Sequence, residues 1–122
     1  MPTKEIPQKE WNDFFTSFSR VHDGWLSALE VTSPSLGALV EARNLCFAGI
    51  SKAGPRDTSL RIFLGDERGA HLSHSVDAPA RVRVQQTDEG ADEALEIEST
   101  NEMKTRLTFR VAAMSDTVDG LR

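Results

Sequence analysis

The amino-acid sequence predicts an α+β, mainly β fold: an antiparallel meander of about seven strands, strongly bent or barrel-like, with one N-terminal amphipathic helix packed on it. Apolar residues recur at every second position through most of the chain, which is typical of strands with one buried face. A helical period occurs only near the N-terminus, so no second helix can provide the crossover that parallel strands need. The chain of 122 residues has the size of one domain, and we expect residues 1–122 to form it.

The predicted helix spans about residues 8–22 and carries an aromatic stripe. Four rings recur at intervals that place them on one helix face: Trp11, Phe14, Phe15 and Phe18. Such a stripe ordinarily packs into a core, and a helix that offers these rings to a partner protein is the alternative. Gly24 is expected to end the helix, because glycine readily adopts the left-handed conformation that terminates helices.

The rest of the chain predicts strands with short connections. They are expected at about 25–32, 38–47, 59–65, 71–76, 80–87, 93–99 and 105–113. In the second of these, the apolar phase shifts between Ala42 and Leu45, which predicts a β-bulge or corner near Asn44. Short connections favour pairing between strands that are neighbours in sequence.

The exposed faces of the last three predicted strands carry opposite charges. Glu96 and Glu98 alternate on the middle strand, and arginines alternate on the other two. These arginines are Arg81, Arg83, Arg106 and Arg110. Opposite charges on facing positions predict that the three strands are neighbours. Each such cross-strand pair contributes about 0.2–1 kcal/mol, so the charges fix register more than stability.

The composition excludes several classes of function. The formal net charge is -5, which disfavours binding to nucleic acid or to an anionic membrane surface. No apolar run approaches the roughly 20 residues that a membrane-spanning helix needs. The single cysteine, Cys46, lies in an apolar run and is expected to be a buried, inert thiol. The N-terminal residues do not have the pattern of a signal peptide, so the cytoplasm is the expected location.

Several segments resemble one known family along nearly the whole chain. They are Trp11–Phe15, Phe18–Arg20, Gly24–Leu26, Val40–Leu45, His71–Val76 and Glu89–Glu98. These segments, in this order and spacing, are similar to a bacterial family of small proteins of unknown function, the DUF5335-type family. The resemblance implies a single-domain bacterial protein. It implies no activity, and therefore no catalytic residue or cofactor.

Two histidines invite a metal or ligand hypothesis. On a strand, the spacing of three places His71 and His74 on opposite faces, with His71 outward and His74 inward or at the mouth of a barrel. A metal site needs three or four ligands. His22, Asp66 and Glu67 complete one only if the fold brings them to the histidines, so we assign no metal site. An inward His74 is unusual in an apolar row and should have a hydrogen-bond partner.

The acidic run from Asp88 to Glu98 does not have the register of a calcium-binding loop, and no nucleotide-binding or hydrolase motif occurs. No catalytic residue and no cofactor are therefore assigned. We expect a non-enzymatic binding or assembly module that acts on an unknown protein partner or by self-association. It would use a sheet edge or the outer sheet face, with Phe63 and Leu26 as candidate contacts. The alternative is a small-ligand or metal-binding barrel with His74, Trp25 and His71 near its pocket.

Overall fold

The computed structural model describes residues 3–35, 37–52, 59–65 and 71–109. One helix is preceded by a short strand and followed by seven longer ones. In chain order the elements are β1 (Thr3–Ile6), the 3-10 turn η1 (Gln8–Glu10), α1 (Trp11–His22), β2 (Leu26–Ser33), β3 (Gly37–Lys52), β4 (Leu60–Gly65), β5 (His71–Val76), β6 (Pro79–Gln86), β7 (Asp92–Ser99) and β8 (Lys104–Phe109).

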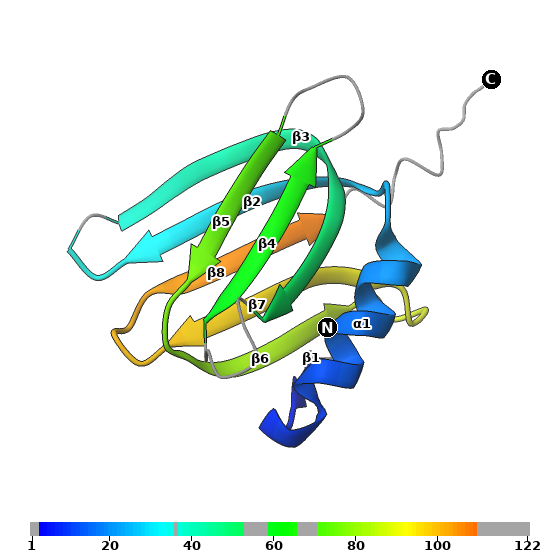
Figure 1. Ribbon diagram of the computed structural model, residues 1–122, viewed down its shortest axis with the longest axis horizontal. Helices are drawn as coiled ribbons and strands as arrows, with labels where there is room; N and C mark the ends of the chain where they lie inside the picture. The colour runs from blue at the N-terminus through cyan, green and yellow to red at the C-terminus, as the bar shows by residue number, and fades with distance from the viewer. Residues whose placement is uncertain (1–2, 36, 53–58, 66–70, 110–122) are drawn as a thin grey trace.

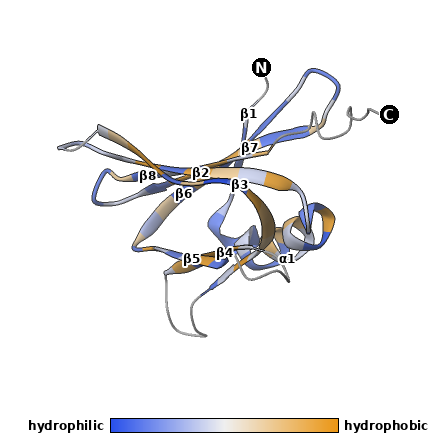
Figure 2. Cartoon of the chain, turned by 90° about the horizontal axis from the view of Figure 1, so that it is seen from above, coloured by the Kyte–Doolittle hydropathy of each residue, from blue (hydrophilic) through white to orange (hydrophobic). Residues whose placement is uncertain are grey.

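All eight strands form one antiparallel sheet in the order β1-β6-β7-β8-β2-β3-β4-β5. The sheet folds over on itself, so that β4 and β5 lie as a second layer across the layer that contains β2, β6, β7 and β8 (Figures 1 and 2). The strand β3 belongs to both layers, because it pairs with β2 at one end and with β4 at the other. The described sheet is not closed, and β1 and β5 are its two edges.

This architecture confirms the predicted fold class and shows where the strand boundaries differ. All seven predicted strands are present, and β1 is an eighth strand that the sequence pattern did not indicate. The second predicted strand continues beyond residue 47 to Lys52. Residues 110–113 of the last predicted strand lie outside the described residues. The chain forms two meanders, β2–β5 and β6–β8, which are joined through the pairing of β8 with β2.

The strand β3 is irregular in two regions. In the first, the register with β2 shifts between Ser27 and Leu29 and again between Leu29 and Glu30, and Asn44 in this region has a φ of 58°, which confirms the bulge predicted there. In the second, the register with β4 shifts between Phe47 and Gly49, where the strand leaves one layer for the other. Gly49 has a φ of 155°, a conformation that residues with a Cβ rarely adopt.

The helix α1 is fastened to β3 at this second bend. Ser19 Oγ accepts a hydrogen bond from the Ile50 N–H (3.0 Å) and donates one to the Ile50 carbonyl oxygen (3.2 Å). The side chain therefore satisfies both backbone groups of a residue next to a break in the sheet ladder. A Cβ at Gly49 would lie 3.7 Å from Ser19 Oγ, so helix and strand are in close contact here.

The core fills the space between the two layers and the helix. The predicted aromatic stripe is confirmed, since Trp11, Phe15 and Phe18 are buried and Phe14 is partly buried against them. The inward rows of the sheet meet these rings, and among them Leu29, Ile62 and Val82 have no exposed surface. Burying such side chains is the main force that holds an open sheet in its folded-over shape.

The last residue of α1 is a buried histidine, His22. His22 is 2% exposed, and its ring lies 4.1 Å from that of Phe18 and 4.9 Å from that of Phe109. Its Nδ1 donates to the Phe18 carbonyl oxygen (2.8 Å), and its Nε2 lies 3.0 Å from Asp92 Oδ2. This contact links the end of the helix to the start of β7.

We expect Ser19→Ala to lower the free energy of unfolding by roughly 1–3 kcal/mol, because it leaves the N–H and carbonyl of Ile50 without their side-chain partner. Urea denaturation measures this change. Ser17→Ala is the matched control, since Ser17 is exposed on the same helix and its loss should change stability by less than about 0.5 kcal/mol. Equal effects of the two substitutions would contradict the role of Ser19 at the bend.

We expect Asp92→Ala to destabilise the fold by roughly 1–3 kcal/mol, because the buried His22 Nε2 then faces no polar group. Asp88→Ala removes a carboxylate from the exposed turn before β7 and should leave the midpoint of thermal unfolding nearly unchanged. Scanning calorimetry of both variants compares the two sites. A midpoint for Asp92→Ala equal to that of the parent protein would show that the His22 contact contributes nothing.

Candidate functional site

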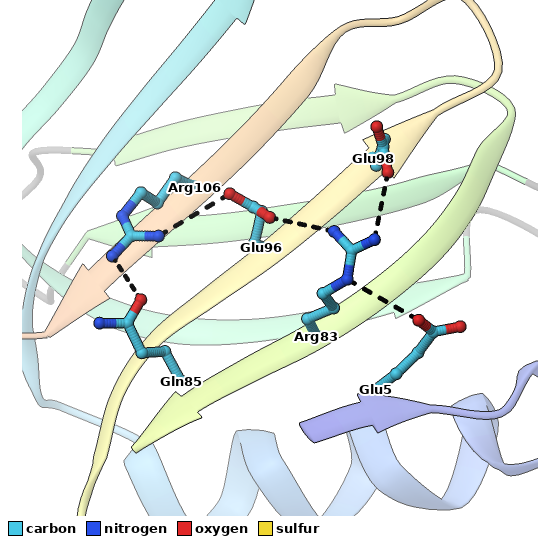
Figure 3. A network of polar contacts seen from close by, with 6 residues as sticks. All are labelled: Glu5, Arg83, Gln85, Glu96, Glu98 and Arg106. Carbon is cyan, nitrogen blue, oxygen red and sulfur yellow. Dashed lines mark hydrogen bonds and ion pairs between the residues drawn. The ribbon is translucent and has the colours of Figure 1, made fainter. Parts of the chain in front are cut away.

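The outer face of β6, β7 and β8 carries a network of charged side chains (Figure 3). Arg83 lies 3.3 Å from Glu96, 3.5 Å from Glu98 and 3.7 Å from Glu5. Arg106 lies 3.8 Å from the other oxygen of Glu96, and it also donates to the Gln85 side-chain oxygen (2.9 Å). The prediction that these three strands are neighbours in the sheet is therefore confirmed. Arg110, which the sequence placed on the same face, lies outside the described residues.

The network is balanced within itself. Two guanidinium groups face three carboxylates in it, so Arg83 and Arg106 are both paired with acidic side chains of the same face. The pairs are partly exposed, and each contributes at most about 1 kcal/mol to stability. Their main effect is to fix the register in which Arg83, Glu96 and Arg106 lie side by side on adjacent strands.

The two edges of the sheet differ in how they are protected. β1 is four residues long and carries Lys4 and Glu5, of which Glu5 is paired with Arg83. Short length and charged side chains are common devices that prevent an edge strand from pairing with another chain. β5 is six residues long, with the sequence HLSHSV, and contains no acidic residue, lysine, arginine, proline or glycine. Every residue of β5 pairs with β4 in an unbroken register, so no bulge protects this edge.

A large apolar side chain lies beside the β5 edge. Phe63 of β4 is 38% exposed and stands opposite Ser73, so the small serine leaves the ring uncovered. The predicted outward direction of Phe63 is confirmed. Leu26 is half-buried at the start of β2, where it faces Cys46, and it belongs to a different part of the sheet. The structure therefore places Phe63 at the edge and Leu26 away from it.

The inner side of β5 carries the second histidine of interest. His74 is half-buried between Leu72 and the buried Val76 in the inward row, while His71 is exposed, as their spacing predicts. Burial lowers the pKa of His74, and the carboxylates of Glu41 and Asp77 partly oppose this effect. The ring is therefore mainly neutral at pH 7. No hydrogen bond joins it to any of the described residues.

A cavity of about 100 Å³ lies on this inner side of β5. His74 and Val76 form one wall, and Ser99 and Thr105 at the turn-proximal ends of β7 and β8 form the other. Both hydroxyl-bearing residues are buried, with exposed fractions of 6% and 4%. Across the part of the chain that the structure describes, neither side-chain hydroxyl has a hydrogen-bond partner.

Trp25 does not share this cavity with His74. Its ring lies 4.5 Å from that of His22 and 5.7 Å from that of Phe109, at the start of β2. Val31, near the other end of β2, lines the cavity. It lies about 20 Å from Trp25 along the strand. His74 and Trp25, which we expected from the sequence to lie near one pocket, therefore lie at opposite ends of the sheet.

A second hollow, of about 250 Å³, lies where α1 begins. Lys9, Asn12 and Lys52 at its rim are exposed to solvent. The buried Trp11 at its base already donates its indole N–H to the Ile6 carbonyl oxygen (2.9 Å). Among the described residues that line this hollow, no polar group is both buried and without a partner, so we do not assign it a ligand.

The described residues around the histidines do not form a metal centre. Within the described ranges, no group of three or more His, Cys, Asp and Glu side chains is placed to hold a metal ion. Both ring nitrogens of His22 are occupied, one by the Phe18 carbonyl and one by Asp92. Asp66 and Glu67, which the sequence offered as further ligands, lie outside the described residues.

The sequence pattern indicates the inward direction of Ser99 and Thr105. Ser99 is in phase with the buried Leu95 and Ile97, and Thr105 is in phase with the buried Leu107. Period two therefore predicts that both face inward. That the two residues share a cavity with His74 depends on the folding-over of the sheet, and no local sequence pattern shows this fold.

Comparisons with known proteins give a family but no activity. The model of the family DUF5335, described as a family of unknown function, matches residues 2–118. No curated protein and no solved structure matches the chain. In the described part of the chain, no helix is long and apolar enough to cross a membrane. The chain belongs to the DUF5335 family, as its resemblance to that family predicts.

Proposed function

We propose that this DUF5335 protein is a non-enzymatic assembly module that pairs with a second copy of itself through the free edge of β5. The observation that carries the proposal is the unprotected edge. Among the described residues, the backbone groups of β5 that point away from β4 have no strand partner, and the six residues of β5 include no charged side chain, proline or bulge to prevent pairing. Addition of a strand to such an edge is a common mode of protein recognition.

The composition of β5 favours a second copy as the partner. Its outward residues are His71, Ser73 and Ser75, and its inward residues are Leu72, His74 and Val76. An antiparallel pair of β5 strands, related by a two-fold axis at Ser73, keeps outward residues opposite outward residues and inward opposite inward. No carboxylate, ammonium or guanidinium group belongs to β5, so like charges do not meet across the new pair.

Phe63 supports the same arrangement. In the paired sheet, its ring would flank the two facing strands on their outer side, next to the small side chain of Ser73. Apolar area beside the new backbone hydrogen bonds would add to the stability of the pair. A pair of such short strands nevertheless buries little surface, so we expect a weak dimer that forms reversibly as concentration rises.

The proposal includes the cytoplasm as the site of action. Cys46 is the only cysteine of the sequence and is free, which suits a reducing compartment. Another protein that adds a strand to β5 remains an alternative partner, and it would use the same edge.

We expect the dimerisation constant to weaken at least about tenfold in Ser73→Lys, because a lysine of each copy then meets the other across the two-fold axis. Analytical ultracentrifugation over a range of concentrations measures the constant. Ser51→Lys is the matched control: it places the same side chain at an exposed position on β3, opposite Arg61 of β4 and not on β5. This control should dimerise like the parent protein.

Amide hydrogen exchange provides the second measurement. As the parent protein is concentrated, exchange should slow in residues 71–76 and stay unchanged in β1. A parent protein that remains monomeric at every concentration would overturn self-association. A dimer that forms without slower exchange in β5, or that Ser51→Lys weakens as much as Ser73→Lys, would show that the contact lies elsewhere.

A further inference from the structure

We propose that the cavity between β5 and the β7–β8 hairpin binds a small neutral molecule that carries hydroxyl or amide groups. The inference rests on polar groups of the core that have no partner among the described residues, and it does not depend on the pairing of β5. Ser99 and Thr105 provide hydroxyl groups on one side of the cavity, and His74 provides a ring nitrogen on the other.

The two buried hydroxyls are the main observation. Ser99 and Thr105 lie in inward rows whose other members are apolar: Leu95, Ile97, Leu107 and Phe109. A buried hydroxyl that forms no hydrogen bond destabilises the fold, so buried polar side chains in proteins are nearly always paired. No described residue pairs with either of them, although both line the cavity. A bound molecule with its own polar groups would satisfy both.

His74 adds a donor and an acceptor to the same space. Its ring is half-buried, faces inward and has no hydrogen bond to the described residues. Because burial lowers the pKa of His74, the ring is mainly neutral at pH 7 and offers one N–H and one lone pair. The three side chains together can therefore both donate and accept hydrogen bonds, which matches a hydroxyl or amide group.

The charges around the cavity exclude an anion. Asp77 lines the cavity, and the carboxylate of Glu41 acts on His74 from β3. No lysine or arginine is among the described residues that line it. A carboxylate or phosphate would therefore meet negative charge with no positive charge to balance it. The absence of a three-ligand cluster in the described residues also disfavours a metal ion.

The volume limits the size of the ligand. A cavity of about 100 Å³ holds about three water molecules, since each occupies about 30 Å³ in the liquid. Nucleotides and intact sugars are too large. The ligand is thus a compact molecule such as a short diol or a simple amide, or the polar end of a longer one whose remainder stays in solvent.

Titration of the protein with three probes of nearly equal size tests this inference by NMR. Ethylene glycol is neutral, acetate is an anion and guanidinium is a cation. We expect saturable shifts of the backbone amides of Ser99 and Thr105 and of the His74 ring with ethylene glycol, and no saturable shift with acetate. Thr105→Val, which keeps the shape and removes the hydroxyl, should weaken ethylene glycol binding about tenfold.

The control is Thr108→Val on the same strand, because Thr108 belongs to the outward row of β8 and is not part of the cavity wall. It should bind ethylene glycol like the parent protein. His74→Ala gives a second test, with the expected loss of binding and an unchanged fold by amide spectrum. Absence of any saturable shift, binding of guanidinium alone, or equal binding by Thr105→Val would overturn the proposal, and ordered water would then be the occupant.

Discussion

The bend of β3 at Gly49 is the constraint on which the rest of the structure depends. If this strand of 16 residues continued straight, β4 and β5 would extend the first layer, and the apolar rows of both would face solvent. The bend interrupts the ladder between Phe47 and Gly49, and it needs a backbone conformation that glycine adopts most readily. Ser19 of α1 then provides the hydrogen bonds that Ile50 makes at this point. The helix and the bend thus stabilise each other.

The bend also decides what lies at each end of the folded sheet. At one end, the aromatic face of α1 fills the space between the layers, and His22 reaches Asp92 at the start of β7 and Phe109 at the end of β8. Because β7 and β8 are antiparallel, Ser99 and Thr105 lie at the other end, which no helix of the described residues covers. The small cavity lies at this end, away from α1.

The sequence predicts the elements well and their arrangement incompletely, for physical reasons. Alternation locates strands because burial of one face is a local property, and it even locates the bulge at Asn44. β1 escapes detection because its four residues include three exposed ones and only Ile6 is buried. Pairing of β8 with β2 joins segments from opposite parts of the chain, and no local pattern encodes such a contact. The contact of His22 with Asp92 is unpredictable for the same reason.

The same reasoning explains why the candidate sites converge on β5. In a folded chain, nearly every backbone group and buried polar side chain finds a partner, so the exceptions indicate where another molecule binds. His22 illustrates the rule, because both its nitrogens are occupied and it is left without a free group for chemistry. Among the described residues, β5 departs from the rule on two sides: its outer backbone edge has no strand partner, and His74 on its inner side shares a cavity with two hydroxyls that form no hydrogen bond. An edge strand that is free of charged side chains and lines a polar cavity can offer another molecule two kinds of contact: backbone hydrogen bonds on its outer side and side-chain hydrogen bonds on its inner side.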